Sequence, residues 1–306
     1  MINIIFFGTP AIALKSLEHL YNSDTINVLA VVTQPDKPAG RGHKITMSAL
    51  KQFAIEHNLP VFQPKSIRKE PDIQEELKKL NPDFFVTFAF GQILSQEVLD
   101  IPRYETINLH ASLLPRYRGA NPIQRAIING DKETGICTMI TELGLDCGDV
   151  CIRQKIEIPD NMTCVDLFEK ISDASPDLLE KTLIGLVKKT ITPEKQAECG
   201  ICMANKLTKE ETLIDWSKSA TEIHNLVRGI YKTPSAYFIY NNKVVKVLET
   251  QVIKGKCTKC GEFVNVSKEG IEVGCGKDNI LLIKVKPEGK GEMFARDWAN
   301  GLHITK

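Results

Sequence analysis

The sequence predicts an α/β protein in which a mostly parallel sheet is followed by a small β-barrel domain. Near-continuous apolar runs alternate with segments whose apolar residues recur at helical spacing, a pattern typical of parallel strands covered on both faces. In the C-terminal third, several short strand candidates separated by turn residues lie within about 60 residues, for which an OB-like barrel is an economical arrangement. The 306 residues, 42% hydrophobic and 25% charged, suit one large or two ordinary globular domains.

The elements of the first domain follow from the spacing of apolar residues. Apolar runs predict parallel strands at residues 2–7, 28–33, 61–62, 83–88 and 106–109. Apolar residues three or four apart predict helices at residues 11–21, 47–56, 73–80, 122–129 and 164–189. Two longer strands, an antiparallel addition to the sheet, are predicted at residues 134–141 and 149–158. Ligands bind at the carboxyl ends of parallel strands, so a site is expected in the loops that follow them.

A change in composition marks the second domain. Residues 190–205 are polar and include Pro193, and we interpret them as a linker between domains at residues 1–189 and 206–306. After the linker we expect a helix at residues 220–230. The strands predicted for this domain are residues 236–240, 244–248, 262–266, 271–273 and 280–285.

Charge is balanced overall but uneven along the chain. Lys and Arg number 39 and Asp and Glu 38, a net charge of +1 that argues against a globally basic nucleic-acid coat. The basic excess lies in residues 206–306, which suits a domain facing a polyanion, although random scatter of surface charge explains it equally well. No apolar run approaches the length of a membrane span and the N-terminus lacks signal-peptide features, so we expect a cytoplasmic protein.

The densest group of chemically useful side chains lies at residues 107–119, where a predicted parallel strand ends. Asn108 and His110 are two residues apart and therefore share one face of that strand. Downstream, a glycine-flanked turn carries two carboxylates, Asp146 and Asp149, and an Asp near His110 could orient the imidazole. An amide donor, an imidazole and a carboxylate together suggest a site, but from spacing alone a hydrogen-bonded strand end and an ordinary turn are the commoner explanations.

Residues 108–123 resemble the signature of the 10-formyltetrahydrofolate-dependent formyltransferases. The branch of that family that formylates methionyl-tRNA is indicated by segments 7–10, 33–42, 204–207, 214–216, 223–229 and 287–290. The resemblance covers nearly the whole chain and implies a Rossmann-like formyltransferase domain followed by an OB-like, tRNA-binding domain. It places Asn108, His110 and Asp146 on catalytic positions. It also implies a folate-contacting loop formed by Ser112, Leu113, Leu114 and Pro115.

The same resemblance implies a reaction and its partners. A cytoplasmic enzyme would move the formyl group of its co-substrate, 10-formyltetrahydrofolate, to the α-amino group of initiator methionyl-tRNA, with no membrane involved. We also expect a monomer, since nothing in the sequence demands a dimer, and no metal, because the acceptor amine is already a good nucleophile. The basic, glycine-rich segment at residues 37–44 would engage the acceptor arm of the tRNA through Arg41, supported by Lys37 and Lys44. By composition alone, that segment is a flexible surface loop.

Other hypotheses stay open. A formyltransferase acting on another amine, such as that of a nucleotide sugar, would leave the basic segment 37–44 and the basic tail unexplained. A non-catalytic RNA-binding protein with a degenerate enzyme domain would not need an intact catalytic set. The pairs Cys199/Cys202 and Cys257/Cys260 are separated by more than an ordinary zinc ribbon allows, so we expect no metal site there.

Overall fold

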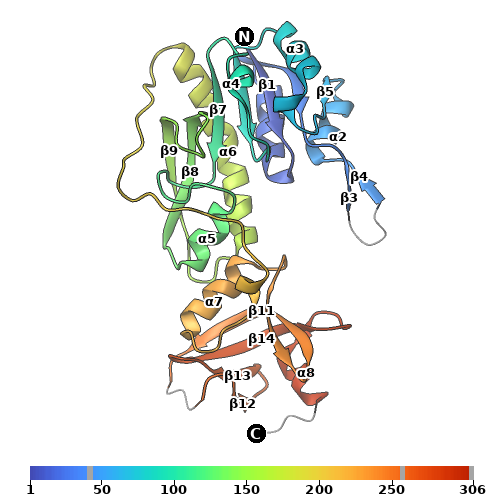
Figure 1. Cartoon of the computed structure of the whole chain (residues 1–306). Coiled ribbons are helices and arrows are strands. Elements are labelled where there is room, and N and C mark those ends of the chain that lie inside the picture. Colours follow the sequence, from blue (N-terminus) through green and yellow to red (C-terminus); the bar gives the residue numbers. More distant parts are fainter. Residues whose placement is uncertain (40–43, 256–258, 303–306) are drawn as a thin grey trace. The chain divides into compact units, whose positions relative to one another are not determined.

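The computed structural model describes residues 1–39, 44–255 and 259–302, which divide into two compact units (Figure 1). The first unit comprises Met1–Gly119, Thr134–Ile156 and Phe168–Met203. The second comprises Ala120–Glu133, Glu157–Leu167 and Ala204–Lys306. The chain therefore contributes two early segments to the unit that its C-terminal third forms.

The first unit is built on a seven-stranded sheet with the order β5-β2-β1-β6-β7-β8-β9. Its strands are β1 (Ile2–Gly8), β2 (Ile26–Val32), β5 (Val61–Phe62), β6 (Phe84–Phe88), β7 (Glu105–His110), β8 (Glu133–Ile140) and β9 (Val150–Glu157). The pairs from β5 to β7 are parallel, and β8 pairs antiparallel with β7. The predicted parallel sheet with an antiparallel addition is confirmed.

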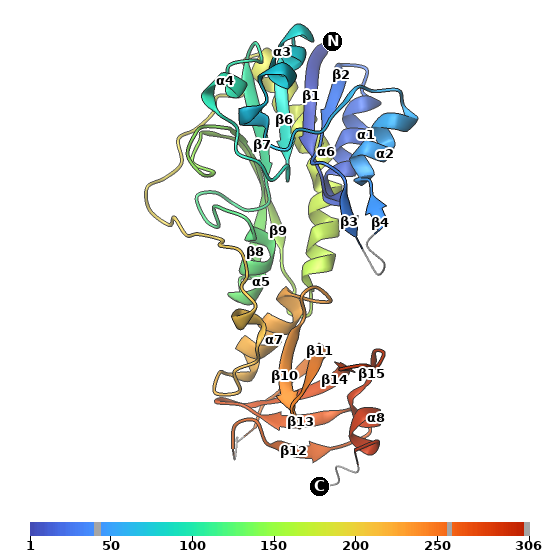
Figure 2. The same ribbon diagram turned by 45° about the vertical axis from the view of Figure 1, so that its right-hand side comes forward.

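Helices cover both faces of this sheet (Figure 2). They are α1 (Leu14–Tyr21), α2 (Ala49–Glu56), α3 (Pro71–Lys79), α4 (Gln96–Leu99), α6 (Cys164–Val187) and the short 3-10 helices η1 (Ala11–Ala13) and η2 (Ile67–Lys69). Ile5 and Phe7 of β1 pack with Leu77 of α3 and Val98 of α4. None of the described helices is both long and apolar enough to cross a membrane.

Polar contacts link α6 to α1 and to strand β8 of the sheet. His19 of α1 lies 2.7 Å from the Glu180 carboxylate of α6, and Thr138 of β8 bonds Thr182 of α6 through their hydroxyls at 2.7 Å. Successive side chains of a strand point to opposite faces of the sheet. Because helices cover both faces, most residues of β1 are buried and its sequence is a nearly continuous apolar run.

Two differences from the expected elements have local causes. Helix α2 begins at Ala49, two residues later than predicted, because the Ser48 side chain caps it by accepting a hydrogen bond from Lys51 N. A hairpin of β3 (Lys37–Ala39) and β4 (Lys44–Thr46) was not predicted, since strands of three residues carry almost no periodic signal.

The second unit contains a six-stranded antiparallel sheet with the order β10-β11-β14-β13-β12, and β15 also pairs with β14. The strands are β10 (Ala236–Tyr240), β11 (Lys243–Ile253), β12 (Phe263–Val266), β13 (Ile271–Gly274), β14 (Asn279–Pro287) and β15 (Met293–Phe294). The helical segments are α5 (Pro122–Ile128), η3 (Glu210–Thr212), α7 (Ala220–Gly229) and α8 (Ala295–Asn300). The predicted C-terminal β domain is confirmed, while β15 and α8 are too short to show a period.

Candidate functional site

Strand β7 brings Asn108 and His110 to the carboxyl edge of the parallel strands. Asn108 lies opposite Thr87 of β6, whose hydroxyl donates a 2.8 Å hydrogen bond to Asn108 Oδ1. A carboxamide has one accepting oxygen and one donating nitrogen, so this bond fixes which end of the amide faces β6. Among the described residues, Asn108 Nδ2 has no hydrogen-bond partner, and it remains available as a donor.

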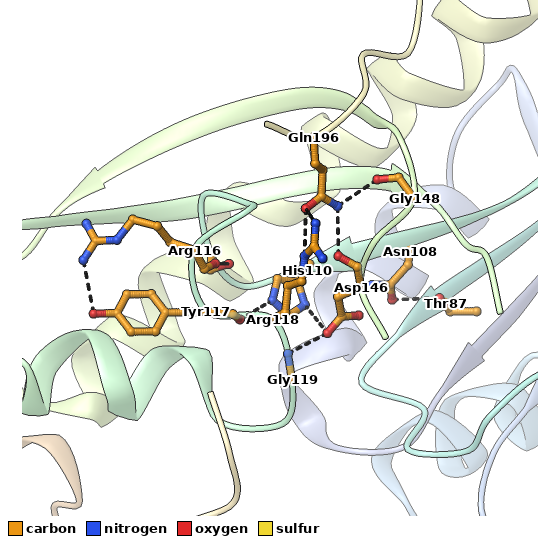
Figure 3. Close-up of polar contacts among 11 residues, drawn as sticks. Thr87, Asn108, His110, Arg116, Tyr117, Arg118, Gly119, Asp146, Gly148 and Gln196 are labelled. Atoms are coloured by element: carbon orange, nitrogen blue, oxygen red, sulfur yellow. Dashed lines mark hydrogen bonds and ion pairs between the residues drawn. The ribbon is translucent and has the colours of Figure 1, made fainter. Parts of the chain in front are cut away.

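The imidazole of His110 is held in one orientation by its neighbours, as Figure 3 shows. His110 is 6% exposed, and its Nε2 lies 2.8 Å from the carbonyl oxygen of Tyr117. A carbonyl can only accept, so Nε2 must carry a hydrogen. In the neutral ring, Nδ1 is therefore the unprotonated nitrogen, and it faces Asp146 Oδ2 at 3.6 Å.

Asp146 is fixed by the turn that joins β8 to β9. Its backbone has a φ of 48°, a left-handed conformation, and its Oδ2 accepts a 2.7 Å hydrogen bond from Gly119 N. The turn requires a glycine at position 148, because a Cβ there would lie 2.0 Å from the carbonyl oxygen of Ile140. The structure thus brings His110 and Asp146 together, and Figure 3 shows Asn108 beside them on β7.

The expected folate-contacting loop consists of Ser112, Leu113, Leu114 and Pro115. Two of its side chains turn inward. The Ser112 hydroxyl is buried and donates a 2.6 Å hydrogen bond to Arg116 O, while Leu114 packs on Cys137, Met139 and Val150. Leu113 and Pro115 are half-buried. A ligand at this loop would therefore meet backbone groups and these two apolar side chains.

A segment that the sequence predicted only as a linker crosses the two loops of the site. We call residues 194–203 the strap, because it runs past both the loop after β7 and the turn after β8. The Gln196 side chain donates to the carbonyl oxygens of Asp146 and Gly148, at 2.9 and 2.8 Å. Its Oε1 accepts two hydrogen bonds from Arg118, from Nε at 3.1 Å and from Nη2 at 2.7 Å.

Backbone contacts anchor the strap at both ends. Glu194 and Val150 exchange N–H to carbonyl hydrogen bonds of 2.8 and 2.9 Å. Cys202 O accepts from Arg118 N at 3.0 Å, and Cys202 Sγ accepts from Tyr117 N at 3.2 Å. The segment predicted as a linker therefore contacts the site, but its polar, aperiodic sequence carries no signal that could have revealed this.

A small network of hydrogen bonds holds Asp36, the residue that precedes β3. Lys51 Nζ donates a 2.6 Å hydrogen bond to one oxygen of Asp36, and Gln63 Nε2 donates to the other at 2.9 Å. These hydrogen bonds, that of Lys51 first, hold the pKa of the Asp36 carboxyl below its usual value. The base of the hairpin is therefore anchored to α2 and to the residue that follows β5.

Two of the three basic residues expected to contact nucleic acid begin the strands of this hairpin, Lys37 in β3 and Lys44 in β4. Lys37 is exposed and donates a 2.8 Å hydrogen bond to the Gln34 side chain. Arg41 lies outside the described residues, and so does the side chain of Lys44. Of the three, only Lys37 therefore has a described side-chain contact.

The cysteines form no recognisable metal centre within residues 1–39, 44–255 and 259–302, where no group of three or more His, Cys, Asp or Glu residues could hold an ion. Cys257 lies outside these ranges. Cys199 is exposed, whereas Cys151 is half-buried and Cys137 is buried opposite His110 in the sheet. Burial raises the pKa of both of these thiols to about 12.

Two family models match the chain. One, described as "Formyl transferase", matches residues 2–183, and the other, described as "Formyl transferase, C-terminal domain", matches residues 206–303. The methionyl-tRNA formyltransferase of Clostridium perfringens (strain 13) is 47% identical over 299 residues, which are 97% of this chain and 96% of that protein. That of Clostridium novyi is 45% identical over 302 residues, 98% and 97% of the two chains.

Solved structures share the fold at lower identity. An N-formyltransferase from Helicobacter canadensis, in complex with folinic acid and dTDP-3-aminofucose, is 22% identical with a TM-score of 0.67 and covers 92% of this chain and 99% of its own. A methionyl-tRNA formyltransferase from Clostridium thermocellum is 18% identical with a TM-score of 0.59 and covers 84% and 96%. Both likenesses concern the fold.

The raised thiol pKa values predict unequal alkylation of the cysteines. A thiol whose pKa is about 12 stays protonated until the pH approaches 12, so at pH 8 Cys137 and Cys151 should react with iodoacetamide at least about 100-fold more slowly than exposed Cys199. Peptide mass spectrometry over time measures the rates, and the chain unfolded in denaturant is the control. Comparable rates for the three thiols in the folded chain would contradict the prediction.

Proposed function

The chain belongs to the methionyl-tRNA formyltransferase family, and we propose that Asn108, His110 and Asp146 carry out its reaction. The chain is a folate-dependent enzyme that transfers a formyl group to the amino group of methionyl-tRNA. One observation carries the proposed roles. The imidazole of His110, which lies on the same strand as Asn108 and is oriented by Tyr117 O, faces the Asp146 carboxylate.

The nucleophile in this reaction is an amine that needs little activation. An α-amino group titrates near about 7.7–8 in peptides, and esterification of the neighbouring carboxyl lowers that value, so neutral amine is available. The species of highest free energy is the tetrahedral one, in which negative charge develops on the formyl oxygen. We assign Asn108 Nδ2 to that oxygen, because Thr87 holds the other end of the amide and leaves the nitrogen free to donate.

His110 and Asp146 are suited to move the proton that the attacking amine must lose. Because Nε2 is committed to Tyr117 O, the ring can accept a proton only at Nδ1, the nitrogen that faces Asp146. Asp146 then stabilises the imidazolium that forms. The same proton can go to N10 of the folate as its bond to the formyl carbon breaks, and such transfers contribute roughly 10²–10⁴-fold.

The remaining parts of the proposal concern partners and location. We assign residues 1–189 to catalysis, 190–205 to a linker that also touches the site, and 206–306 to tRNA binding. The donor is 10-formyltetrahydrofolate, contacted by the loop Ser112–Pro115, and the acceptor is initiator methionyl-tRNA. The enzyme acts as a monomer in the cytoplasm and uses no metal, because its acceptor is already a good nucleophile. Full-length relatives at 47% identity support this acceptor over a sugar amine.

The substrate assignment has a direct test. Formyl label from 10-formyltetrahydrofolate should appear on charged initiator tRNA, far less on charged elongator tRNA, and not on a dTDP-amino sugar. Equal labelling of the two tRNAs would remove the initiator assignment. Labelling of the sugar alone would contradict methionyl-tRNA as the acceptor and point to a sugar amine instead.

Substitution of Asn108 by alanine should lower turnover far more than it weakens folate binding. Loss of one donor to a developing oxyanion costs about 10²–10³-fold in kcat, whereas the ground-state contacts of the folate are left in place. Single-turnover formylation of methionyl-tRNA, with folate affinity by titration, separates the two effects. Formylation by Asn108→Ala at the wild-type rate would reject the assigned role.

The Thr87 hydroxyl should matter through the amide that it orients. Thr87→Val removes a hydrogen bond worth about 1 kcal/mol, and the Asn108 amide then loses its preferred orientation, so kcat should fall about fivefold with KM unchanged. Thr87→Ser keeps the hydroxyl and is the matched control. A Thr87→Val enzyme with the kcat of the Thr87→Ser enzyme would contradict the orientation.

Arg41 is proposed to contact tRNA near its acceptor end, so the effect of removing its side chain on the formylation rate should depend on the size of the acceptor. Arg41→Ala should reduce formylation of charged tRNA but leave formylation of a minimal methionyl-nucleoside near the wild-type rate, since the nucleoside has no acceptor-arm phosphates. The two initial rates, compared at several salt concentrations, measure this. An equal loss on both acceptors would argue against a role in the acceptor arm.

A further inference from the structure

The Gln196 carboxamide makes every hydrogen bond that its chemistry allows. Oε1 accepts from two Arg118 nitrogens, and the two hydrogens on Nε2 go to the carbonyl oxygens of Asp146 and Gly148. Figure 3 shows this side chain above the catalytic group, between the loop after β7 and the turn after β8. A single amide therefore joins two loops that are about 30 residues apart along the chain.

The position of Gln196 separates its role from ordinary packing. Its side chain is half-buried, and its strap neighbours Lys195, Ala197 and Glu198 are exposed, so no apolar core depends on it. The groups that it contacts belong instead to the loops that shape the site. Arg118 immediately precedes Gly119, whose N–H holds the Asp146 carboxylate at 2.7 Å.

Asp146 needs such support because of its backbone. Its φ of 48° lies in the left-handed region, which costs free energy for a residue with a side chain and persists only where the surroundings hold it. Gly119 N holds its carboxylate, and Gln196 holds its carbonyl oxygen. Without the second contact, the residue can relax toward an ordinary conformation and carry its carboxylate away from His110 Nδ1.

We propose that Gln196 is a positioning residue that clamps the Asp146 turn to Arg118 and so fixes the distance between the Asp146 carboxylate and His110. This proposal rests on the catalytic roles proposed above for His110 and Asp146. It gives the strap a function in the reaction itself, because the strap carries the amide that joins the two loops.

Gln196→Glu tests the clamp because it alters one side only. The carboxylate keeps its acceptor contacts to Arg118, but it presents oxygen instead of N–H to the two carbonyls of the Asp146 turn. We expect kcat to fall roughly 10- to 100-fold, with KM for both substrates within about twofold, since a small misplacement of a catalytic group is costly. Gln196→Met, which loses both sides, should show a loss of similar size. Glu198→Gln on the same strap is the control and should match wild type.

A double-mutant cycle decides whether Gln196 acts through Asp146. If it does, adding Gln196→Glu to Asp146→Asn should lower kcat by less than about twofold further, because the carboxylate to be positioned is already gone. A full second loss in that background would overturn the clamp. Wild-type kcat for Asp146→Asn alone would instead overturn the proposed role of Asp146, whatever Gln196 does.

A purely structural role gives a different result. The thermal unfolding of each variant is followed by circular dichroism, and kcat is measured at several temperatures below the start of its transition. The clamp predicts that the deficit of Gln196→Glu and Gln196→Met persists at every such temperature. Recovery of wild-type kcat in the folded variants, or no loss at all, would show that Gln196 only stabilises the loops.

Discussion

The geometry of the site depends on one carboxylate oxygen, Asp146 Oδ2, which meets Gly119 N at 2.7 Å and His110 Nδ1 at 3.6 Å. These partners come from a strand end and a loop, and Asp146 itself comes from a turn between two other strands. For all three to meet, the chain must adopt left-handed backbone at Tyr117, with a φ of 61°, as well as at Asp146. The loops of this edge are therefore shaped around that meeting point.

The sheet explains why the other two groups lie there. Parallel strands release their loops at a common edge, and alternation along β7 places Asn108 and His110 on one face. Each group is then restricted by one neighbour that leaves a single atom free for chemistry. Thr87 occupies the oxygen of the Asn108 amide, and Tyr117 O occupies Nε2 of His110. These two hydrogen bonds thus determine which atom of Asn108 can donate to the oxyanion and which atom of His110 can accept a proton.

Much of the fold could be predicted because its strands are buried on both faces. The run around Phe6 and Phe7 is apolar without interruption, and such runs are characteristic of a parallel sheet. Asn108 and His110 were found from spacing, since a strand fixes which residues share a face. Asp146 was one of two candidate carboxylates in a turn until the resemblance to a family singled it out, because its distance from His110 is a property of tertiary structure.

Gln196 could not have been found in the same way. It lies in a polar segment without period, and its hydrogen bonds run to main-chain carbonyls and to Arg118, far away in sequence. Likewise, the short β3–β4 hairpin depends on Asp36, Lys51 and Gln63 meeting in space. Contacts of this kind leave no trace in composition or spacing.

A crystal structure with a non-transferring 10-formyl folate analogue bound tests the central claim most directly, because it keeps the formyl group on the same nitrogen as the co-substrate does. The account predicts the formyl oxygen at about 2.7–3.1 Å from Asn108 Nδ2, with the His110–Asp146 pair beside the formyl carbon. A folate bound with its formyl group out of hydrogen-bonding reach of Asn108, and on the far side of β7 from His110, would contradict it.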